Sequence, residues 1–244
     1  MIGEFLTQET ATNRYIIVAL IAAIAASVSL YFSIGVIGAP TGAVVTAGSD
    51  SQMVQGAAGS DPATGGVITS LTLNATGQTN NWQGYWGYVG SYIVLADSGQ
   101  RFMYSWNTTN QSSGSVIASR ANSLNITALS NQSACTVEDS VIPDAINDKV
   151  SSTFTDGAHT SIVIGNVTIS SNTCTTDLFV DNVSNTTWEE NMLTDGNGKY
   201  VYQVFIHTGY NVFNGNEANF QMIVPEDEAG AAGTTTYYFW LELF

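Results

Sequence analysis

The feature that most constrains this chain is an uncharged apolar stretch near its N-terminus, Tyr15–Ile37, which reads YIIVALIAAIAASVSLYFSIGVI. A helix of this length would span about 34 Å, and the hydrocarbon core of a bilayer is about 30 Å thick. The stretch therefore predicts a long apolar helix. The preceding segment, Met1–Arg14, carries Glu4 and Glu9 and does not resemble a secretory signal. We therefore expect the helix to be retained.

The predicted helix has two different faces. Small residues recur on one side at helical spacing, and bulky aliphatic and aromatic residues occupy the other. Small side chains let helix backbones approach closely, so the pattern favours packing against other helices, copies of the same chain included. The alternative is a lone membrane anchor. The residues expected to form the helix contact are Ala19, Ala22, Ala23, Ala26, Ser29 and Ser33.

Beyond the helix the composition changes to that of short strands. Gly38 and Pro40 favour a helix end. We predict three parts: the apolar helix at residues 1–38, a Gly-rich linker at 39–66 and an extracellular β domain at 67–244. The expected fold class is α+β, with one long N-terminal apolar helix followed by a mostly antiparallel, β-sandwich-like domain. Arg14 is followed by no cation until Arg101, which favours an N-terminus inside and a β domain outside.

Alternating polarity and turn residues predict the strands. Val67–Asn74 alternates with a period of two, as a half-buried strand does. Turns at Ala96–Gln100 and Asp195–Gly198 predict two hairpins. Other predictions from the pattern are a short helix at Val116–Leu124 and a final hairpin pairing Asn219–Val224 with Thr234–Phe244.

Aromatic residues concentrate between Trp82 and Trp106, which includes Tyr85, Trp86 and Tyr104. Clustered aromatic rings bind sugars by stacking. They also fill β-sandwich cores and subunit contacts. Both interpretations stay open at this point.

The charge balance excludes one class of partner. Five Lys and Arg stand against twenty Asp and Glu, for a net charge of −15. Binding nucleic acid depends on neutralising phosphates with basic residues, so we expect no nucleic-acid partner. An acidic surface rich in Thr, Ser, Asn and Gly is typical of an extracellular or virion surface. A salt-loving source would give the same balance.

Two further features suit an exterior compartment. Cys135 and Cys174 are the only cysteines, and one disulfide between them would close a loop of about 40 residues, worth about 3–4 kcal/mol. The alternative is two buried thiols. Eight Asn-x-Ser/Thr sequons are predicted glycosylation sites, or else reflect composition: Asn74, Asn107, Asn110, Asn125, Asn131, Asn166, Asn182 and Asn185.

Signals for chemistry are few. The sequence has no nucleophile elbow, phosphate loop, zinc-protease motif or Cys-x-x-Cys. His159 and His207 are the only histidines, and we predict neither catalysis nor an organic cofactor. Oxygen ligands for a structural calcium are available at three places. They are Glu189–Glu190, Glu226–Glu228, and Asp195 with Asn197, where a hairpin turn is the better explanation.

The layout resembles that of archaeal surface-filament subunits of the type IV pilin and archaellin superfamily. The resemblance covers Tyr15–Gly38 in character and residues 67–244 in type only. It implies a filament core made of N-terminal helices, with glycosylated β domains facing outward.

The sequence thus predicts a structural subunit of an extracellular filament on the cell surface. Its expected partners are identical subunits, through the N-terminal helix, and a membrane before assembly. The alternative is a single-pass surface protein of a virion or cell envelope, with the C-terminal domain outside. A membrane-tethered enzyme is a third hypothesis and has no feature in its favour.

Overall fold

The computed structural model describes residues 40–54, 56–90, 92–107, 113–142, 147–155, 159, 161–170, 174–226 and 234–243. The chain divides into two compact units, Met1–Gly38 and Ala39–Phe244. Every described residue belongs to the second unit. The predicted helix Tyr15–Ile37 and its small-face residues, Ala19, Ala22, Ala23, Ala26, Ser29 and Ser33, therefore lie outside the described part.

The expected α+β class with a long helix is wrong. The regular secondary structure of the described residues is mostly antiparallel strand, and their helical segments are η1 (Ile126–Ala128), η2 (Cys135–Val141) and α2 (Val150–Thr153). None of these is long and apolar enough to cross a membrane. After Pro40, turn residues interrupt the chain too often for a membrane-length helix. Two predicted partners depended on that helix: identical subunits that contact each other through it, and a membrane. Both predictions are wrong, and so is the predicted pilin-like organisation.

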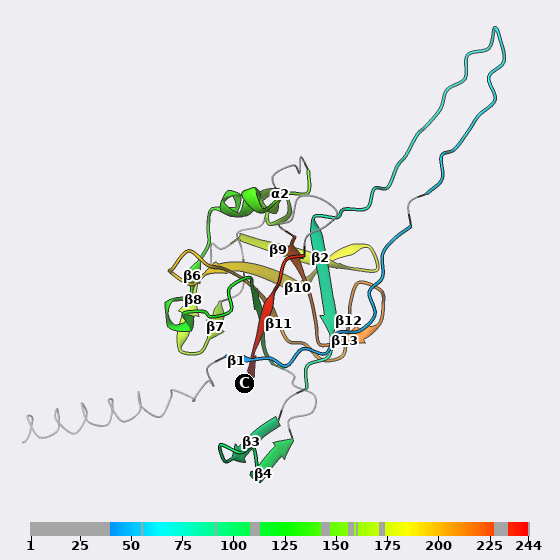
Figure 1. Cartoon of the computed structure of the whole chain (residues 1–244). Helices are drawn as coiled ribbons and strands as arrows, with labels where there is room; N and C mark the ends of the chain where they lie inside the picture. The colour runs from blue at the N-terminus through cyan, green and yellow to red at the C-terminus, as the bar shows by residue number, and fades with distance from the viewer. Residues whose placement is uncertain are drawn as a thin grey trace, which may run out of the picture. The chain divides into compact units, whose positions relative to one another are not determined.

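A seven-stranded antiparallel sheet forms the centre of the second unit (Figure 1). Strand β9 (Cys174–Val180) pairs with the long strand β10 (Val183–Thr194), and the short strand β6 (Ser130–Asn131) pairs with β10 as well. The remaining order across the sheet is β1 (Thr41–Gly42), β15 (Tyr238–Leu243), β5 (Gly114–Ser119), β11 (Tyr200–Phe205), β10 (Val183–Thr194) and β6 (Ser130–Asn131).

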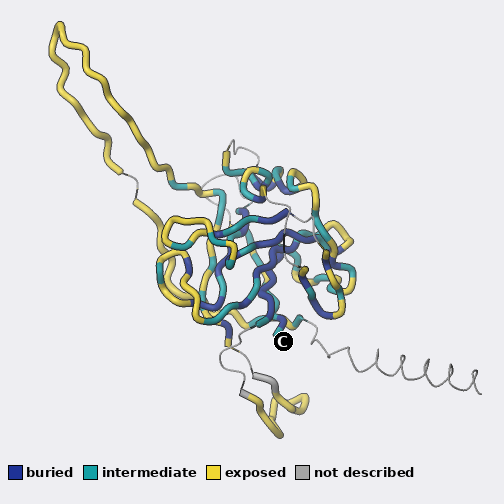
Figure 2. The backbone as a smooth tube through the Cα atoms, turned by 180° about the vertical axis from the view of Figure 1, so that it is seen from behind, coloured by how far each residue is buried: buried dark blue, intermediate teal, exposed yellow. Residues whose placement is uncertain are grey.

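Both faces of this sheet are covered. On one face lie β2 (Trp82–Gly87) and β14 (Phe220–Pro225), which pair with each other, and the core between the layers includes Tyr202 and Met222. On the other face, β7 (Ile162–Ile164) and β8 (Val167–Ile169) belong to a second apolar cluster. Every residue of β5 is buried as a result (Figure 2).

A small third cluster completes the body of the unit. It includes Trp188 and Val212 and lies near the short pair β12 (Tyr210–Asn211) and β13 (Glu217–Ala218). The Trp188 indole donates a hydrogen bond to the Asn211 carbonyl over 2.7 Å.

Local predictions fared better than distant ones. The structure confirms both predicted hairpins, β3 (Tyr92–Ala96) with β4 (Phe102–Asn107), and β10 with β11. The final hairpin is wrong, because β14 pairs with β2, and β15 pairs with β5 and β1.

Two element predictions are also wrong. The helix expected from Val116 is strand β5, because covering both faces makes a strand apolar throughout. The strand expected at Val67–Asn74 does not form, although its residues are described. A strand needs a hydrogen-bonded neighbour, and none of the described strands lies beside this segment.

A buried row of polar side chains crosses four strands of the central sheet. Thr175 Oγ1 donates to Asn191 Oδ1 over 3.0 Å, and Asn191 Nδ2 donates to Gln203 Oε1 over 3.1 Å. Gln203 Nε2 in turn donates to Ser115 Oγ over 3.0 Å. All four residues are buried, so the row satisfies polar groups that would otherwise be costly inside the protein.

Candidate interaction surface

The two cysteines form a disulfide bond, with Cα atoms 5.6 Å apart. Cys135 begins η2 and Cys174 begins β9, so the bond ties the helical turn to the central sheet. Because both cysteines of the sequence are used, the chain carries no other thiol.

The described sequon asparagines lie on the surface or close to it. Asn131 and Asn185 are half-buried, and Asn74, Asn125, Asn166 and Asn182 are exposed. The Asn107 side chain and Asn110 lie outside the described part. The exposed amides of Asn166 and Asn182 occupy turns between strands, where an attached glycan would meet solvent.

The carboxylates proposed for calcium serve other purposes. Asp195 is buried, and its carboxylate accepts hydrogen bonds from the backbone N–H groups of Asn197, Lys199 and Asn125. Burial alone would raise the Asp195 pKa, but these three donors, together with the positive charge of Lys199, outweigh burial and lower the pKa. Asp195 is thus the organising side chain of a hairpin turn.

Carboxylates of the other two candidate groups also accept hydrogen bonds within the protein. Glu190 is buried and accepts the Ile223 N–H, and Glu226 accepts the Thr235 hydroxyl; Asp227 and Glu228 lie outside the described part. Within the described residues, no group of three or more His, Cys, Asp or Glu side chains is placed to hold a metal ion.

His207 lies among aromatic rings. His207 contacts the rings of Trp188 and Tyr210 edge-on, at centroid distances of 5.2 and 5.5 Å. Burial lowers the His207 pKa, so the imidazole is neutral at pH 7. His159 is described, but its neighbours in the sequence lie outside the described part.

Two of the buried carboxyl groups, Glu190 and Glu242, have raised pKa values. Burial raises the pKa of Glu190 well above its usual value, against the opposing effect of the Ile223 N–H. Burial likewise raises the pKa of Glu242 to about 7, although the Gly165 N–H donates to its Oε1 atom. Both groups point into packed protein and serve no open site.

The aromatic segment divides between the core and the surface. Trp82 packs near Phe154 and donates from Nε1 to the Asp148 carbonyl, and Tyr85 contacts Phe239 edge-on. Five other aromatic residues of the segment are exposed, namely Trp86, Tyr88, Phe102, Tyr104 and Trp106. The core interpretation therefore holds for the first two described rings and fails for those on β4.

The β3–β4 hairpin is an exposed apolar projection. Every residue from 94 to 106 is exposed, and β3 and β4 pair only with each other among the described strands (Figures 1 and 2). Tyr104 and Trp106 place their ring centroids 4.8 Å apart, yet they are 59% and 49% exposed. Phe102, Met103 and Leu95 are exposed as well.

The turn of this hairpin is polar. The Asp97 carboxylate accepts the backbone N–H groups of Gly99 and Arg101, both over 2.9 Å. The apolar surface therefore lies along the strands, while the tip carries Asp97 and Arg101.

A second projection precedes β2. Residues 43–80, hereafter the arm, form no strand or helix where they are described, and from residue 56 to 77 every residue is exposed (Figure 2). Its base is clamped by Gln52, which donates to Asn80 Oδ1 over 3.2 Å, and by Gln78, which accepts the Met53 N–H. Asp148 accepts from Thr79 and Asn81 and fixes the returning limb.

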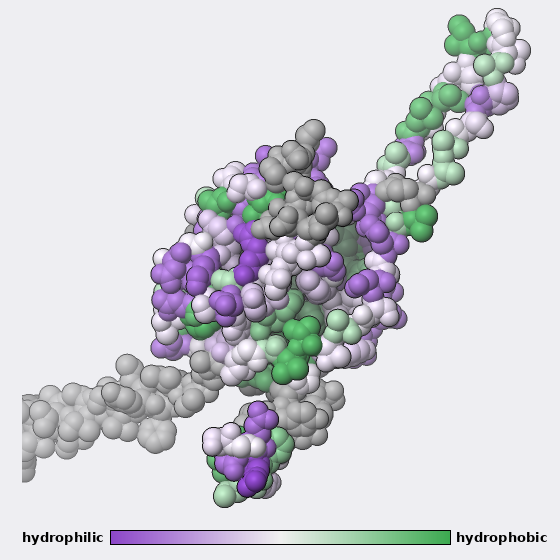
Figure 3. Space-filling view, in the orientation of Figure 1, coloured by the Kyte–Doolittle hydropathy of each residue, from purple (hydrophilic) through white to green (hydrophobic). Residues whose placement is uncertain are grey.

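The outer part of the arm is apolar over a strand-length segment, Val67–Leu73. Ile68 is 100% exposed and Leu73 is 85% exposed, with Val67 and Leu71 about three-fifths exposed. Figure 3 shows apolar residues along the arm. An excursion this long without secondary structure is uncommon in a compact domain and is typical of either a binding loop or a linker.

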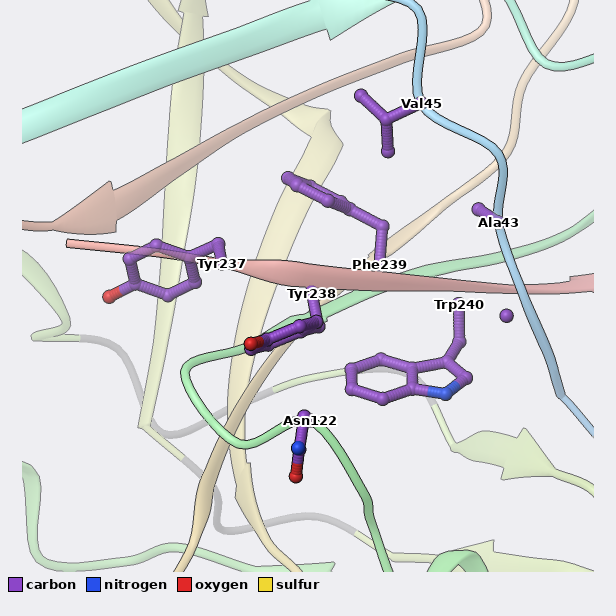
Figure 4. Close-up of a pocket in the computed structure, with 8 residues that line it drawn as sticks. Ala43, Val45, Asn122, Tyr237, Tyr238, Phe239 and Trp240 are labelled. Atoms are coloured by element: carbon purple, nitrogen blue, oxygen red, sulfur yellow. The ribbon is translucent and has the colours of Figure 1, made fainter.

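A shallow groove of about 310 Å³ lies between the first residues of the arm and the strand β15, which run side by side (Figure 4). The root of the arm forms one wall, and the Phe239 and Trp240 side chains leave β15 on opposite sides. The groove contains no charged side chain and is lined by Gly42, Ala43, Val45, Asn122, Tyr237, Tyr238, Phe239 and Trp240.

Sequence reasoning missed both projections as surfaces. The sequence predicts the β3–β4 hairpin, but nothing in its pattern shows whether other strands cover it. The sequence also predicts a linker and a strand for the segment that forms the arm. The signal available was the clustering of aromatic residues together with a strand pattern bounded by Gly-rich sequence.

Comparisons with known proteins indicate no function for these surfaces. No family model matches the chain, and neither the curated proteins nor the solved structures show a significant match to it.

Proposed function

We propose that this chain is a structural subunit of an extracellular surface filament, assembled through its exposed apolar projections, and that it has no catalytic activity. The observation that carries the proposal is the pair of projections, the arm and the β3–β4 hairpin. Each displays large apolar side chains over a length that a packed protein would bury.

The distribution of charge supports this proposal. Two copies, each with a net charge of −15, repel each other, so their contacts must use surfaces with few charges. The arm contains only Asp50 and Asp61 as charged residues, and the hairpin contains only Asp97 and Arg101. Two copies that approach through these regions therefore meet little electrostatic repulsion.

The covalent features support an exterior location. A disulfide between Cys135 and Cys174 suits an oxidising compartment. Four exposed sequon asparagines, including Asn74 on the arm, offer glycan sites on the outside of the unit. An acidic, disulfide-bonded surface protein fits these observations better than a cytosolic one.

The test is assembly of the full-length chain. Negative-stain microscopy and light scattering should show ordered, elongated assemblies that grow with protein concentration. Added salt should promote growth, since it screens repulsion between the acidic copies. Monodisperse single copies at all concentrations and salt levels would contradict the proposal.

A second candidate, an adhesion protein of a virion or cell envelope, is favoured by one observation. The exposed Tyr104 and Trp106 rings offer a stacking platform for sugars. A glycan-binding assay tests it: Trp106→Ala should abolish binding, whereas Trp86→Ala, an exposed indole on β2, should not. Absence of binding by the unmodified protein rejects this candidate.

A further inference from the structure

We propose that the segment Val67–Leu73 of one copy adds as a β-strand to the β3–β4 hairpin of a second copy. The inference rests on the proposed function, for which it names the contacting surfaces and the partner, another copy of the same chain.

The donor segment is built as a strand that lacks a neighbour. Its sequence, VITSLTL, alternates and is rich in β-branched residues. In the structure it is extended without pairing, with Ile68 and Leu73 almost fully exposed. Its backbone N–H and C=O groups make no hydrogen bond within the described part beyond that from Val67 to the Thr64 carbonyl.

The acceptor is a two-stranded hairpin, and such hairpins are at best marginally stable alone in water. Neither the outer edge of β3 nor that of β4 pairs with a described strand. Adding a third strand would satisfy one of these edges. It would also cover apolar side chains such as Leu95 and Tyr104, which are now exposed.

The two surfaces match in charge and in length. Val67–Leu73 contains no charged residue, and the strands β3 and β4 contain none either, since Asp97 and Arg101 belong to the turn. Seven residues of extended chain span about 23 Å, and a six-residue strand spans about 20 Å. The donor can therefore cover the full length of β4.

The positions of donor and acceptor along β2 give the contact a direction. The arm enters β2 at Trp82, and the hairpin follows its other end at Gly87 (Figure 1). Donor and acceptor are thus different patches at opposite ends of one strand. A contact between different patches on identical copies is head-to-tail and builds an open chain unless a ring closes. This is the arrangement a filament requires.

The first experiment is cross-linking between full-length copies. Ile68→Cys in one copy and Met103→Cys in another supply the only free thiols, because both native cysteines form the disulfide. The mixture, treated with a short bis-maleimide, should give heterodimers at least about tenfold above a control that pairs Ile68→Cys with Asn197→Cys, an exposed turn residue.

The second experiment removes backbone donors from the arm. In a ladder, alternate N–H groups face the neighbouring strand, so either Thr69→Pro or Ser70→Pro must remove a hydrogen bond. One of them should weaken assembly by about tenfold or more in concentration. The matched control, Ala57→Pro, lies on the same exposed arm outside the donor segment and should assemble as the unmodified chain does.

The outcomes separate the two proposals. Heterodimers specific to the hairpin, together with a proline effect confined to the donor segment, support strand addition. Normal assembly with no specific cross-link overturns strand addition and leaves the filament function standing. Failure of the unmodified chain to assemble overturns both. Rapid internal cross-linking of an Ile68→Cys/Met103→Cys double variant at high dilution shows that the arm closes on its own hairpin, and overturns exchange between copies.

Discussion

The body of the second unit and its two projections use the same kinds of residue in opposite ways. In the body, strands such as β5 are buried on every residue between two covering layers. On the arm and the hairpin, Ile, Leu, Tyr and Trp side chains are exposed over whole segments. The comparison teaches that a strand pattern shows that a segment can pair with another strand. Whether the segment is buried depends on which other elements pack against it.

The difference has an energetic meaning. Burying apolar surface contributes about 25 cal/mol per Å², so each large side chain left exposed forgoes about 1.5–3 kcal/mol. The body has realised this stabilisation within one copy. The apolar side chains of the projections would contribute this stabilisation only on contact with a partner. Substitutions should therefore affect folding in the body and association in the projections.

The largest effect on folding should come from the body. Trp188 is 1% exposed and its indole donates to the Asn211 carbonyl, so Trp188→Ala leaves a cavity and removes this hydrogen bond. The free energy of unfolding should fall by about 3–5 kcal/mol, as measured by denaturant titration. A loss below about 1 kcal/mol would mean that this cluster is not a closed core.

A smaller effect should depend on pH. Burial raises the pKa of Glu242 from 4.5 to about 7, so between these values the folded protein binds a proton that the unfolded chain has released. The free energy of unfolding should therefore fall as pH rises from about 4.5 to 7, by about 3 kcal/mol, and then level off. Glu190 acts in the same direction.

The Glu242→Gln variant provides the check on this assignment. It keeps an oxygen for the Gly165 N–H and should flatten the pH dependence of the melting temperature. The matched substitution Glu217→Gln, at an exposed position on β13, should leave the slope as it was. Identical slopes in all three proteins would remove Glu242 as the cause.

The smallest effect on folding should come from the projections. Trp106→Ala removes a side chain as large as that of Trp188, yet the Trp106 side chain is half exposed. Its free energy of unfolding should change by less than about 0.5–1 kcal/mol. Denaturant titration beside Trp188→Ala compares the two regions directly, and equal losses would show that the hairpin is part of the core.

Sequence reasoning predicted the parts of the fold that depend on neighbouring residues. Turn chemistry located the hairpin at Asp195–Gly198, where three backbone donors converge on one carboxylate. The pairing of β14 with β2 joins segments far apart in sequence, and no local pattern indicates it. An apolar run such as that of β5 is compatible with either a helix or a buried strand.

The candidate surfaces were harder to foresee than the fold. The pairing of the two cysteines could be predicted without a structure, because two cysteines can form only one disulfide bond. The exposure of Tyr104 and Trp106 depends on which strands fail to cover them, and absent neighbours leave no mark in the sequence. The same limit explains why Val67–Asn74 carries a strand pattern without a strand in a single copy.

The polar row across the central sheet has a consequence for how the chain folds. Sliding β10 by two residues against β11 would keep the apolar faces matched, so hydrophobic burial alone barely resists this error. The slip would separate Asn191 from Gln203 and leave buried amides unpaired, at about 1–3 kcal/mol for each lost group. The polar row therefore favours the native strand register, and it destabilises a shifted register while the sheet is still forming. Its members are Thr175, Asn191, Gln203 and Ser115.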